Sequence, residues 1–151
     1  MKTNAGALMS QVQRMGARIF ERIVRDSGID AFTGAQGKIL YVLWEHGEMT
    51  ISGIARETSL TKSTLTGMLD VLEEKQLIQR IPDTKNRRQI FIRITEKTRE
   101  YKKDYDGITE EMTELTYAGF SEAELRSLED MLKRIKRNLE DYAQRMEGSH
   151  E

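Results

Sequence analysis

The chain contains no cysteine, and its 151 residues include one proline and two histidines. Without cysteine there is no disulfide framework, no thiolate nucleophile and no cysteine-ligated zinc site. His46 and His150 lie far apart in the sequence, and neither belongs to a histidine or histidine–carboxylate cluster of the kind that binds zinc. We therefore predict no metal site, no cofactor and no catalytic residue.

Long apolar runs are also missing. No stretch approaches the roughly 18 apolar residues that a membrane-spanning helix needs, and the first twenty residues lack the continuous apolar core of a signal peptide. We expect a cytoplasmic protein with no membrane partner. The segment GAQGK at 34–38 lacks the flanking residues of a phosphate-binding loop, and neither GxGxxG nor GxSxG occurs. The sequence thus gives no support for an enzyme.

The composition favours one helix-rich domain, because 32% of residues are charged and only one is proline. The net charge of −1 is unevenly distributed. Residues 79–103 carry nine basic and three acidic side chains, whereas residues 104–151 carry six and thirteen. A basic segment of this kind is expected where a protein meets a polyanion such as nucleic acid, although an ordinary solvated surface has the same pattern.

The first half of the chain has the spacing of two amphipathic helices. Apolar residues recur one helical turn apart from Leu8 to Ile23, before Ser27 and Gly28 interrupt the pattern. Thr33 is expected to cap a second helix that ends at His46 and Gly47. The β-leaning segment MTIS at 49–52 follows, and we expect Ser52 to cap a short helix, GIARET.

A further helix is predicted after Thr61, which is a suitable N-cap. Its apolar residues form one stripe, so its polar and small residues must lie off that stripe near the helix start. The stripe contains Leu65, Met68, Leu69 and Leu72; the residues off it are Lys62, Ser63, Thr64, Thr66 and Gly67. Two short helices with hydroxyls on the second are typical of a helix-turn-helix DNA reader, but an ordinary helical hairpin remains open.

The segments LIQRI and QIFIRIT both have strand character and are separated by PDTKNRR. They are predicted to form a hairpin, which after three helices is the order of a winged helix. The basic turn of this wing would reach DNA phosphates or the minor groove. The alternative is that its charges only keep an edge strand soluble.

Two more helices are predicted between Thr95 and Met146, and Ser121 followed by Glu124 predicts a capping box at the second. Apolar residues in this last helix follow a 3-4 repeat: Leu125, Leu128, Leu132, Ile135, Leu139, Tyr142 and Met146. This apolar seam must be covered by a partner. Packing within one chain would cover it, but we favour a homodimer interface.

With these elements placed, residues 8 to 146 resemble the MarR family of bacterial winged-helix regulators. Three stretches carry the resemblance: FTGAQGKILYVLWEHGEMTISGIARETSL, TKSTLTGMLDVLEEKQLIQR and PDTKNRRQIFIRITEKT. The expected fold class is mainly α with a small β-hairpin wing. A winged helix-turn-helix lobe at approximately 33–95 would be flanked by dimerisation helices at approximately 8–26 and 96–146, within a single MarR-like domain over 1–151.

The resemblance implies a homodimeric transcription repressor that binds double-stranded DNA at a pseudo-palindromic operator and is released by a small, often aromatic effector. The implied DNA-binding residues are Thr61, Lys62, Ser63, Thr64, Thr66, Lys85, Asn86, Arg87 and Arg88, with Arg88 in the minor groove. The implied ligand-binding residues are Met15, Ile19, Phe32 and Gln36. The implied dimer interface contains Val12, Leu125, Leu128, Leu132, Ile135, Leu139 and Tyr142.

Two departures from the family pattern affect the DNA-binding residues. Asn86 stands where the family commonly has aspartate, so a charged bond to the wing arginine is replaced by a weaker neutral one. Gly67 and Val71 stand where many members carry arginine. The alternative functions are a winged-helix protein-interaction module, which needs no basic wing, and a helical enzyme, which needs a catalytic cluster.

Overall fold

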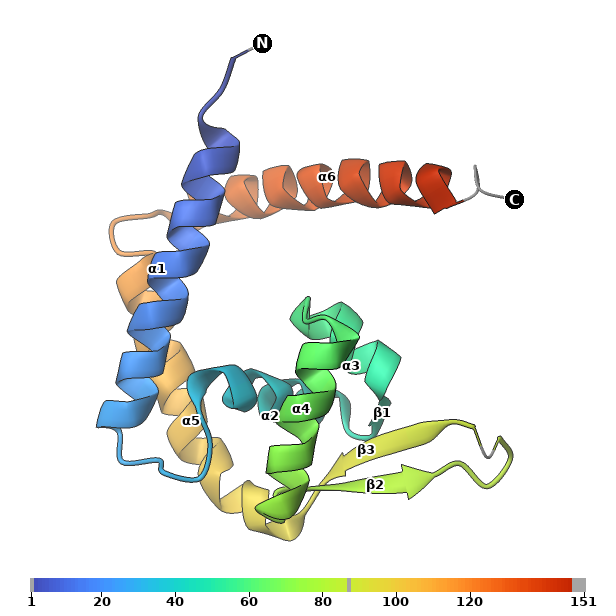
Figure 1. Cartoon of the computed structure of the whole chain (residues 1–151). Helices are drawn as coiled ribbons and strands as arrows, with labels where there is room; N and C mark the ends of the chain where they lie inside the picture. The colour runs from blue at the N-terminus through green and yellow to red at the C-terminus, as the bar shows by residue number, and fades with distance from the viewer. Residues whose placement is uncertain (1, 87, 148–151) are drawn as a thin grey trace. The chain divides into compact units, whose positions relative to one another are not determined.

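The computed structural model describes residues 2–86 and 88–147, and the chain divides into two compact units, residues 1–112 and 113–151. The described residues form six helices and three short strands (Figure 1). The helices are α1 (Ala5–Asp26), α2 (Gly34–His46), α3 (Ile51–Thr58), α4 (Lys62–Glu74), α5 (Glu96–Thr116) and α6 (Glu122–Glu147). The strands are β1 (Met49–Thr50), β2 (Ile78–Pro82) and β3 (Ile90–Ile94). The expected mainly α fold with a β-hairpin wing is confirmed.

The first unit has one hydrophobic core to which every one of its helices contributes. Phe20 and Val24 at the end of α1 pack into this core, whereas the start of α1 is exposed. The most deeply buried residues are Ile39, Leu40, Leu43, Ile54, Leu65, Leu69, Leu72, Leu77 and Ile92. They come from α2, α3, α4, β3 and, for Leu77, the residue just before β2, so burial of their apolar surface fixes these elements against one another.

The predicted cap of α2 is confirmed. The Thr33 hydroxyl accepts a hydrogen bond from the Gln36 backbone N–H at 3.2 Å, and the Gln36 side chain accepts one from the Thr33 N–H at 3.1 Å. These reciprocal bonds form a capping box that satisfies two N–H groups at the helix start. The helix ends at His46 as expected, with Gly47 at a φ of 74° that favours glycine.

The predicted cap of α3 was wrong by two residues. Thr50, not Ser52, is the N-cap, and its hydroxyl accepts a hydrogen bond from the Gly53 N–H at 3.1 Å. Thr50 also belongs to β1, which pairs with β3 through Met49 opposite Ile92. The same threonine therefore ends a strand and begins a helix, and Ser52 lies in the first turn with an exposed side chain.

The sheet has the strand order β1-β3-β2, and both pairings are antiparallel. The hairpin of β2 and β3 is the predicted wing, and its loop extends away from the helices of its unit (Figure 1). Ile92 in β3 is fully buried, whereas Ile90 is exposed and Ile94 is half-buried. The wing is thus anchored at its base and exposed towards its tip.

Aromatic residues surround Tyr105 of α5, in the part of that helix within the first unit. Its ring lies edge-on to those of Phe20 and Phe32, with centroids 5.7 and 5.9 Å apart, and also packs near Trp44. Burial raises the pKa of the Tyr105 hydroxyl well above its ordinary value, because the ionised form would lose its hydration. Tyr105 therefore serves this core as a neutral packing residue.

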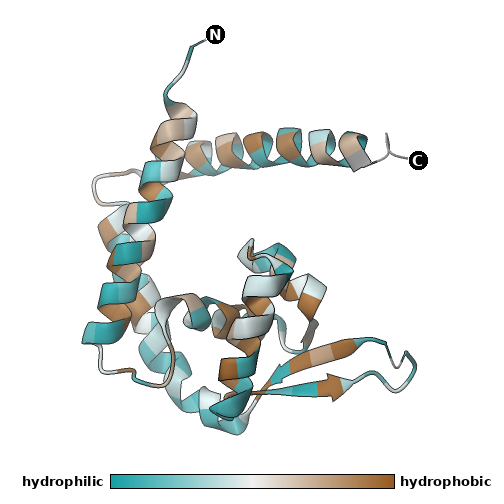
Figure 2. Cartoon of the chain, in the orientation of Figure 1, coloured by the Kyte–Doolittle hydropathy of each residue, from teal (hydrophilic) through white to brown (hydrophobic). Residues whose placement is uncertain are grey.

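In the second unit, the capping box predicted at the start of α6 is confirmed. The Glu124 carboxylate accepts hydrogen bonds from the Ser121 N–H at 2.8 Å and from its hydroxyl at 2.7 Å. Both bonds lower the pKa of Glu124 because they favour its ionised form. Hydrophobic residues recur along α6 between hydrophilic ones (Figure 2), in the repeat that the sequence predicts.

Candidate nucleic-acid interface

The start of α4 presents a group of exposed hydroxyls. Leu65, Leu69 and Leu72 are fully buried, which turns the opposite side of the helix towards solvent. All five residues at this end that were predicted to bind DNA are exposed: Thr61, Lys62, Ser63, Thr64 and Thr66. The Thr61 hydroxyl caps α4 by accepting a hydrogen bond from the Thr64 N–H at 3.3 Å, as expected.

Internal hydrogen bonds involve three of these hydroxyls. The Thr61 hydroxyl donates to that of Thr64 at 2.9 Å, and the Thr66 hydroxyl donates to the Lys62 carbonyl at 2.8 Å. Such bonds restrict the rotation of threonine side chains on a helix. A pre-ordered hydroxyl loses less conformational entropy when it contacts a ligand.

The wing loop is shaped by two residues with short polar side chains. The Asp83 carboxylate accepts a hydrogen bond from the Lys85 N–H at 2.8 Å, and the Asn86 side chain accepts one from the Arg88 N–H at 3.2 Å. The loop is closed by a bond from the Asp83 N–H to the Gln89 carbonyl at 3.0 Å. Asn86 thus helps to fold the turn through a backbone N–H.

Two basic side chains of the loop, Lys85 and Arg88, are exposed, and neither forms an ion pair within residues 2–86 and 88–147. Arg87 lies outside the described residues. Because Lys85 and Arg88 are not neutralised by a carboxylate in that part of the chain, their charge is available to an anionic partner.

An arginine at the base of the wing ties β2 to α4. The Arg80 guanidinium bonds to the Glu73 carboxylate and, at 2.6 Å, to that of Asp70, while Glu73 also accepts the Arg80 backbone N–H. Partial burial acts to lower the pKa of Arg80, but its bonds to Asp70 and Glu73 outweigh that effect, so the pKa is raised. The wing and the exposed hydroxyls of α4 are therefore held on one framework.

A second group of donors lies between α3 and the wing, and of these residues sequence reasoning had predicted only Arg88 to bind DNA. Ser52 and Arg56 of α3 line an open cavity of about 470 Å³ together with Arg88 and Gln89 of the wing loop. Nothing in the sequence around Arg56 distinguishes it from an ordinary surface arginine. Only the pairing of β1 with β3, between residues about forty positions apart, brings it near Arg88.

The residues implied as a ligand site differ in exposure. Met15 is 53% exposed and Ile19 is 36% exposed, whereas Phe32 is 3% exposed and packs edge-on to Tyr101. Gln36 is also buried, and its side chain is bound in the capping box.

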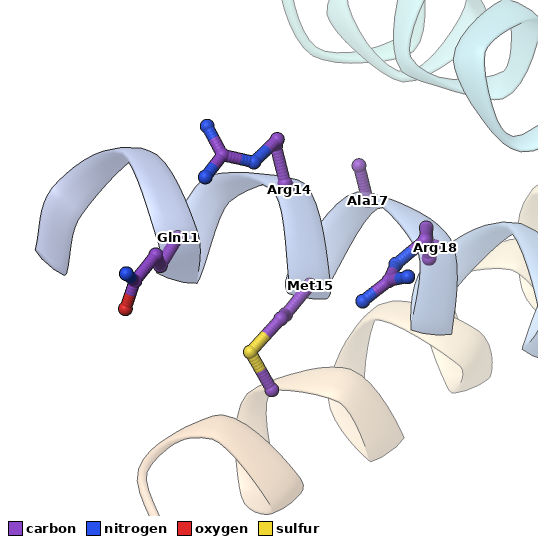
Figure 3. Close-up of a pocket in the computed structure, with 5 residues that line it drawn as sticks. All are labelled: Gln11, Arg14, Met15, Ala17 and Arg18. Atoms are coloured by element: carbon purple, nitrogen blue, oxygen red, sulfur yellow. The ribbon is translucent and has the colours of Figure 1, made fainter. Parts of the chain in front are cut away.

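Met15 lines a cavity of about 540 Å³ along α1, also lined by Gln11, Arg14, Ala17 and Arg18. Its side chain points away from those of Arg14 and Ala17 (Figure 3). Among the described residues that line this cavity, Met15 is the one that belongs to the implied ligand site. The effector site stays a prediction.

The residues implied as a dimer interface are largely exposed in the single chain. Val12 in the first unit is 61% exposed, and in the second unit Leu139 is 66% exposed. Leu132 and Tyr142 are also exposed, whereas Leu125, Leu128 and Ile135 are half-buried. Exposed leucines repeated along a helix are costly in water, which favours a covering partner.

Residues 2–86 and 88–147 contain no group of three or more histidine, aspartate or glutamate side chains that could hold a metal ion. Within the same ranges, no helix is both long and apolar enough to cross a membrane.

Comparison with known proteins supports a family resemblance. The family model described as "MarR family" matches residues 32–90. This range contains α2, α3, α4, β1, β2 and the wing loop, and it ends at the first residue of β3. Over these residues the chain is similar to the MarR family. The resemblance drawn from the sequence is thereby confirmed.

Proteins similar to this chain include two that are named HTH-type transcriptional repressors. IacR of Pseudomonas putida is 28% identical over 120 residues, which cover 80% of this chain and 70% of that protein. MdtR of Bacillus subtilis is 34% identical over 97 residues, which cover 62% of this chain and 63% of that protein.

The chain is also similar to a solved structure of BpsR from Bordetella bronchiseptica, with a TM-score of 0.78. That structure concerns the regulation of BpsR's DNA binding by 6-hydroxynicotinic acid. The match covers 89% of this chain and 99% of BpsR at 22% identity, so it shows the shared fold.

Proposed function

We propose that this chain is a sequence-specific DNA-binding transcription repressor. The observation that carries the proposal is that one compact unit presents both the exposed hydroxyls of α4 and the basic wing, whose Lys85 and Arg88 form no ion pair among the described residues. A helix of this kind reads base edges in the major groove, while the wing contacts the backbone or the minor groove. The relatives named repressors support the same function.

Ser63, Thr64 and Thr66 would contact bases and phosphates, with Thr61 at the helix start and Lys62 contributing mainly charge. In the wing, Lys85, Arg87 and Arg88 would supply positive charge, and Asn86 would shape the turn. Base contacts carry the sequence preference, whereas phosphate contacts fix the position of the protein on DNA.

The test begins with a duplex selected by the wild-type protein from a random pool. Thr64→Ala and Thr66→Ala should each change the preference among selected sequences, since one lost base contact costs about 1–3 kcal/mol. Lys62→Ala should weaken all duplexes alike. Ser127→Ala removes an exposed hydroxyl from α6 and serves as the matched control. Wild-type preference in both threonine variants would exclude α4 as the reader, and no enrichment of any duplex would exclude DNA binding.

The repressor is proposed to act as a homodimer on a pseudo-palindromic operator. The apolar seam of α6 and the exposed apolar side chains at the start of α1 would lie in the dimer interface. A two-fold dimer presents two reading helices, and so matches two half-sites of opposite direction. The proposed location of such a regulator is the cytoplasm.

A small aromatic effector is proposed to release the repressor from DNA. Its site would include Met15 and Ile19, and the regulation described for BpsR supports an effector of this class. An effector that binds better to a dimer geometry unsuited to DNA shifts the population away from the DNA-binding form. A screen of phenolic acids should find one that raises the melting temperature and weakens binding to the selected duplex; no effect from any of them would count against an aromatic effector.

A further inference from the structure

The cavity between α3 and the wing loop joins two arginines that come from distant parts of the sequence. Arg56 belongs to α3 and Arg88 to the wing loop, and both line the same cavity of about 470 Å³. Ser52 and Gln89 lie in its wall beside them. All four belong to the first unit, which holds α3 and the wing in one sheet-linked framework.

The charge of this cavity is not balanced by the part of the chain that the structure describes. No aspartate or glutamate is among its described lining residues, and neither Arg56 nor Arg88 forms an ion pair there. The two arginines of the sheet differ from them, because each is paired with a carboxylate. Arg80 bonds to Asp70 and Glu73, and Arg93 bonds to Glu48. Two guanidinium groups sharing one cavity repel each other, and an anion placed between them removes that cost.

The donors around the cavity suit a phosphate. A guanidinium group presents several N–H donors in a planar fork that matches two phosphate oxygens. The cavity has two such groups, from Arg56 and Arg88, together with the Ser52 hydroxyl and the Gln89 amide. These donors could together occupy more oxygen lone pairs than a carboxylate offers. A tetrahedral phosphate, with oxygens pointing in several directions, can be reached from both walls.

We propose that Arg56 and Arg88 together hold one phosphate of the DNA backbone, with the Ser52 hydroxyl donating to the same group. This inference rests on the proposed DNA binding and adds α3 to the contact surface. It also assigns Arg88 a different partner from the minor groove that the family resemblance implies. The two assignments differ in a measurable way, because a phosphate contact carries no base preference.

A double-mutant cycle on the selected duplex tests whether both arginines hold the same phosphate. Arg56→Ala and Arg88→Ala should each weaken binding on the order of tenfold, the value expected for loss of a charge-assisted hydrogen bond. The double variant should lose little more than either single variant, whereas independent contacts would give about a hundredfold loss. Near-additive losses would overturn the shared phosphate.

Two further measurements separate a phosphate contact from a base contact and from a general charge effect. The double variant should lower the salt slope of binding by about one unit, as expected for a single phosphate, and should weaken duplexes with A·T-rich and G·C-rich flanks equally. A selective loss for A·T-rich flanks would overturn the assignment of Arg88. Lys103→Ala, which removes one exposed positive charge from α5, should have a smaller effect than Arg56→Ala.

Methylphosphonate substitution of single backbone positions in the duplex identifies the phosphate itself. One position should weaken wild-type binding and have no further effect on the Arg56→Ala variant, since each change removes the same contact. If no position shows this pattern, the inference fails while the proposed DNA binding stands. If the wild type selects no duplex at all, both fail.

The phosphate bound in this cavity could also belong to a free phosphorylated molecule instead of DNA. Inorganic phosphate titrated into the protein without DNA, followed by the NMR shifts of the Ser52 and Gln89 amides, measures binding of the free anion. The duplex should displace it from the wild type. Saturable binding of inorganic phosphate together with an additive cycle on DNA would instead assign the cavity to a free phosphorylated ligand.

Discussion

At the scale of single residues, Gly37 shows how closely α2 approaches the aromatic core. A Cβ atom at this position would lie 2.5 Å from a ring carbon of Tyr105 and 3.1 Å from one of Phe32. Both rings are buried, so neither moves freely. A glycine in the middle of a helix lowers its stability, and close packing of the two rings against the backbone accounts for its presence here.

Gly37→Ala should therefore destabilise the protein by about 1–3 kcal/mol, because the added methyl group overpacks the core. Gly107→Ala in α5 is the matched control. No heavy atom lies within 4 Å of the Cβ added there, and the substitution should stabilise the helix by about 0.5–1 kcal/mol. Urea unfolding of both variants measures these changes, and equal effects in the two would contradict the packing argument.

At the scale of helices and strands, the bonds from Arg80 to Asp70 and Glu73 join the wing to α4. The Arg80 side chain is only 21% exposed, so its loss leaves two carboxylates without their cation and removes packed methylene groups. Arg80→Ala should lower the free energy of unfolding by about 1–2 kcal/mol. Arg99→Ala, which breaks an exposed ion pair to Glu96, should change it by less than about 0.5 kcal/mol.

The start of a helix could be predicted where its capping residue and the residue that it bonds are close together in the sequence. Thr33 with Gln36, Thr61 with Thr64, and Ser121 with Glu124 are each three residues apart, and each makes the expected capping bond. These bonds depend only on neighbouring residues, so the sequence alone contains the information needed to predict them.

The start of α3 and the cavity beside Arg56 could not be predicted from the sequence, because both depend on contacts between residues far apart in the chain. Thr50 is selected as the cap over Ser52 because β1 pairs with β3, and that pairing joins residues about forty positions apart. The same pairing places Arg56 beside the wing. Short strands carry little sequence signal of their own, since their stability comes from partners across the sheet.

At the scale of the whole molecule, the two units carry opposite charge. Residues 1–112 hold 18 basic and 16 acidic side chains, a difference of +2, and residues 113–151 hold 6 and 9, a difference of −3. A polyanion is thus attracted to the unit that presents α4 and the wing and repelled by the other. This division supports DNA contact through the first unit and a different role for the second.

The apolar seam of α6 leads to a prediction for the assembled protein. Sedimentation should give about 35 kDa, twice the 17.5 kDa of one chain. Leu132→Asp with Leu139→Asp should dissociate or unfold the dimer, because both charges would be buried in the interface. Arg134→Asp with Arg137→Asp places charge on the opposite side of α6 and should leave a dimer. A stable dimer in the leucine variant would show that the seam is not the interface.

The bond from the Thr66 hydroxyl to the Lys62 carbonyl limits what that side chain offers to a base. Because its only proton is already donated, Thr66 presents acceptor lone pairs and a methyl group. Such a surface suits the amino groups of cytosine and adenine and the methyl group of thymine. Guanine offers only acceptors in the major groove, so a guanine opposite Thr66 would find no donor there, and the preferred operator should avoid it.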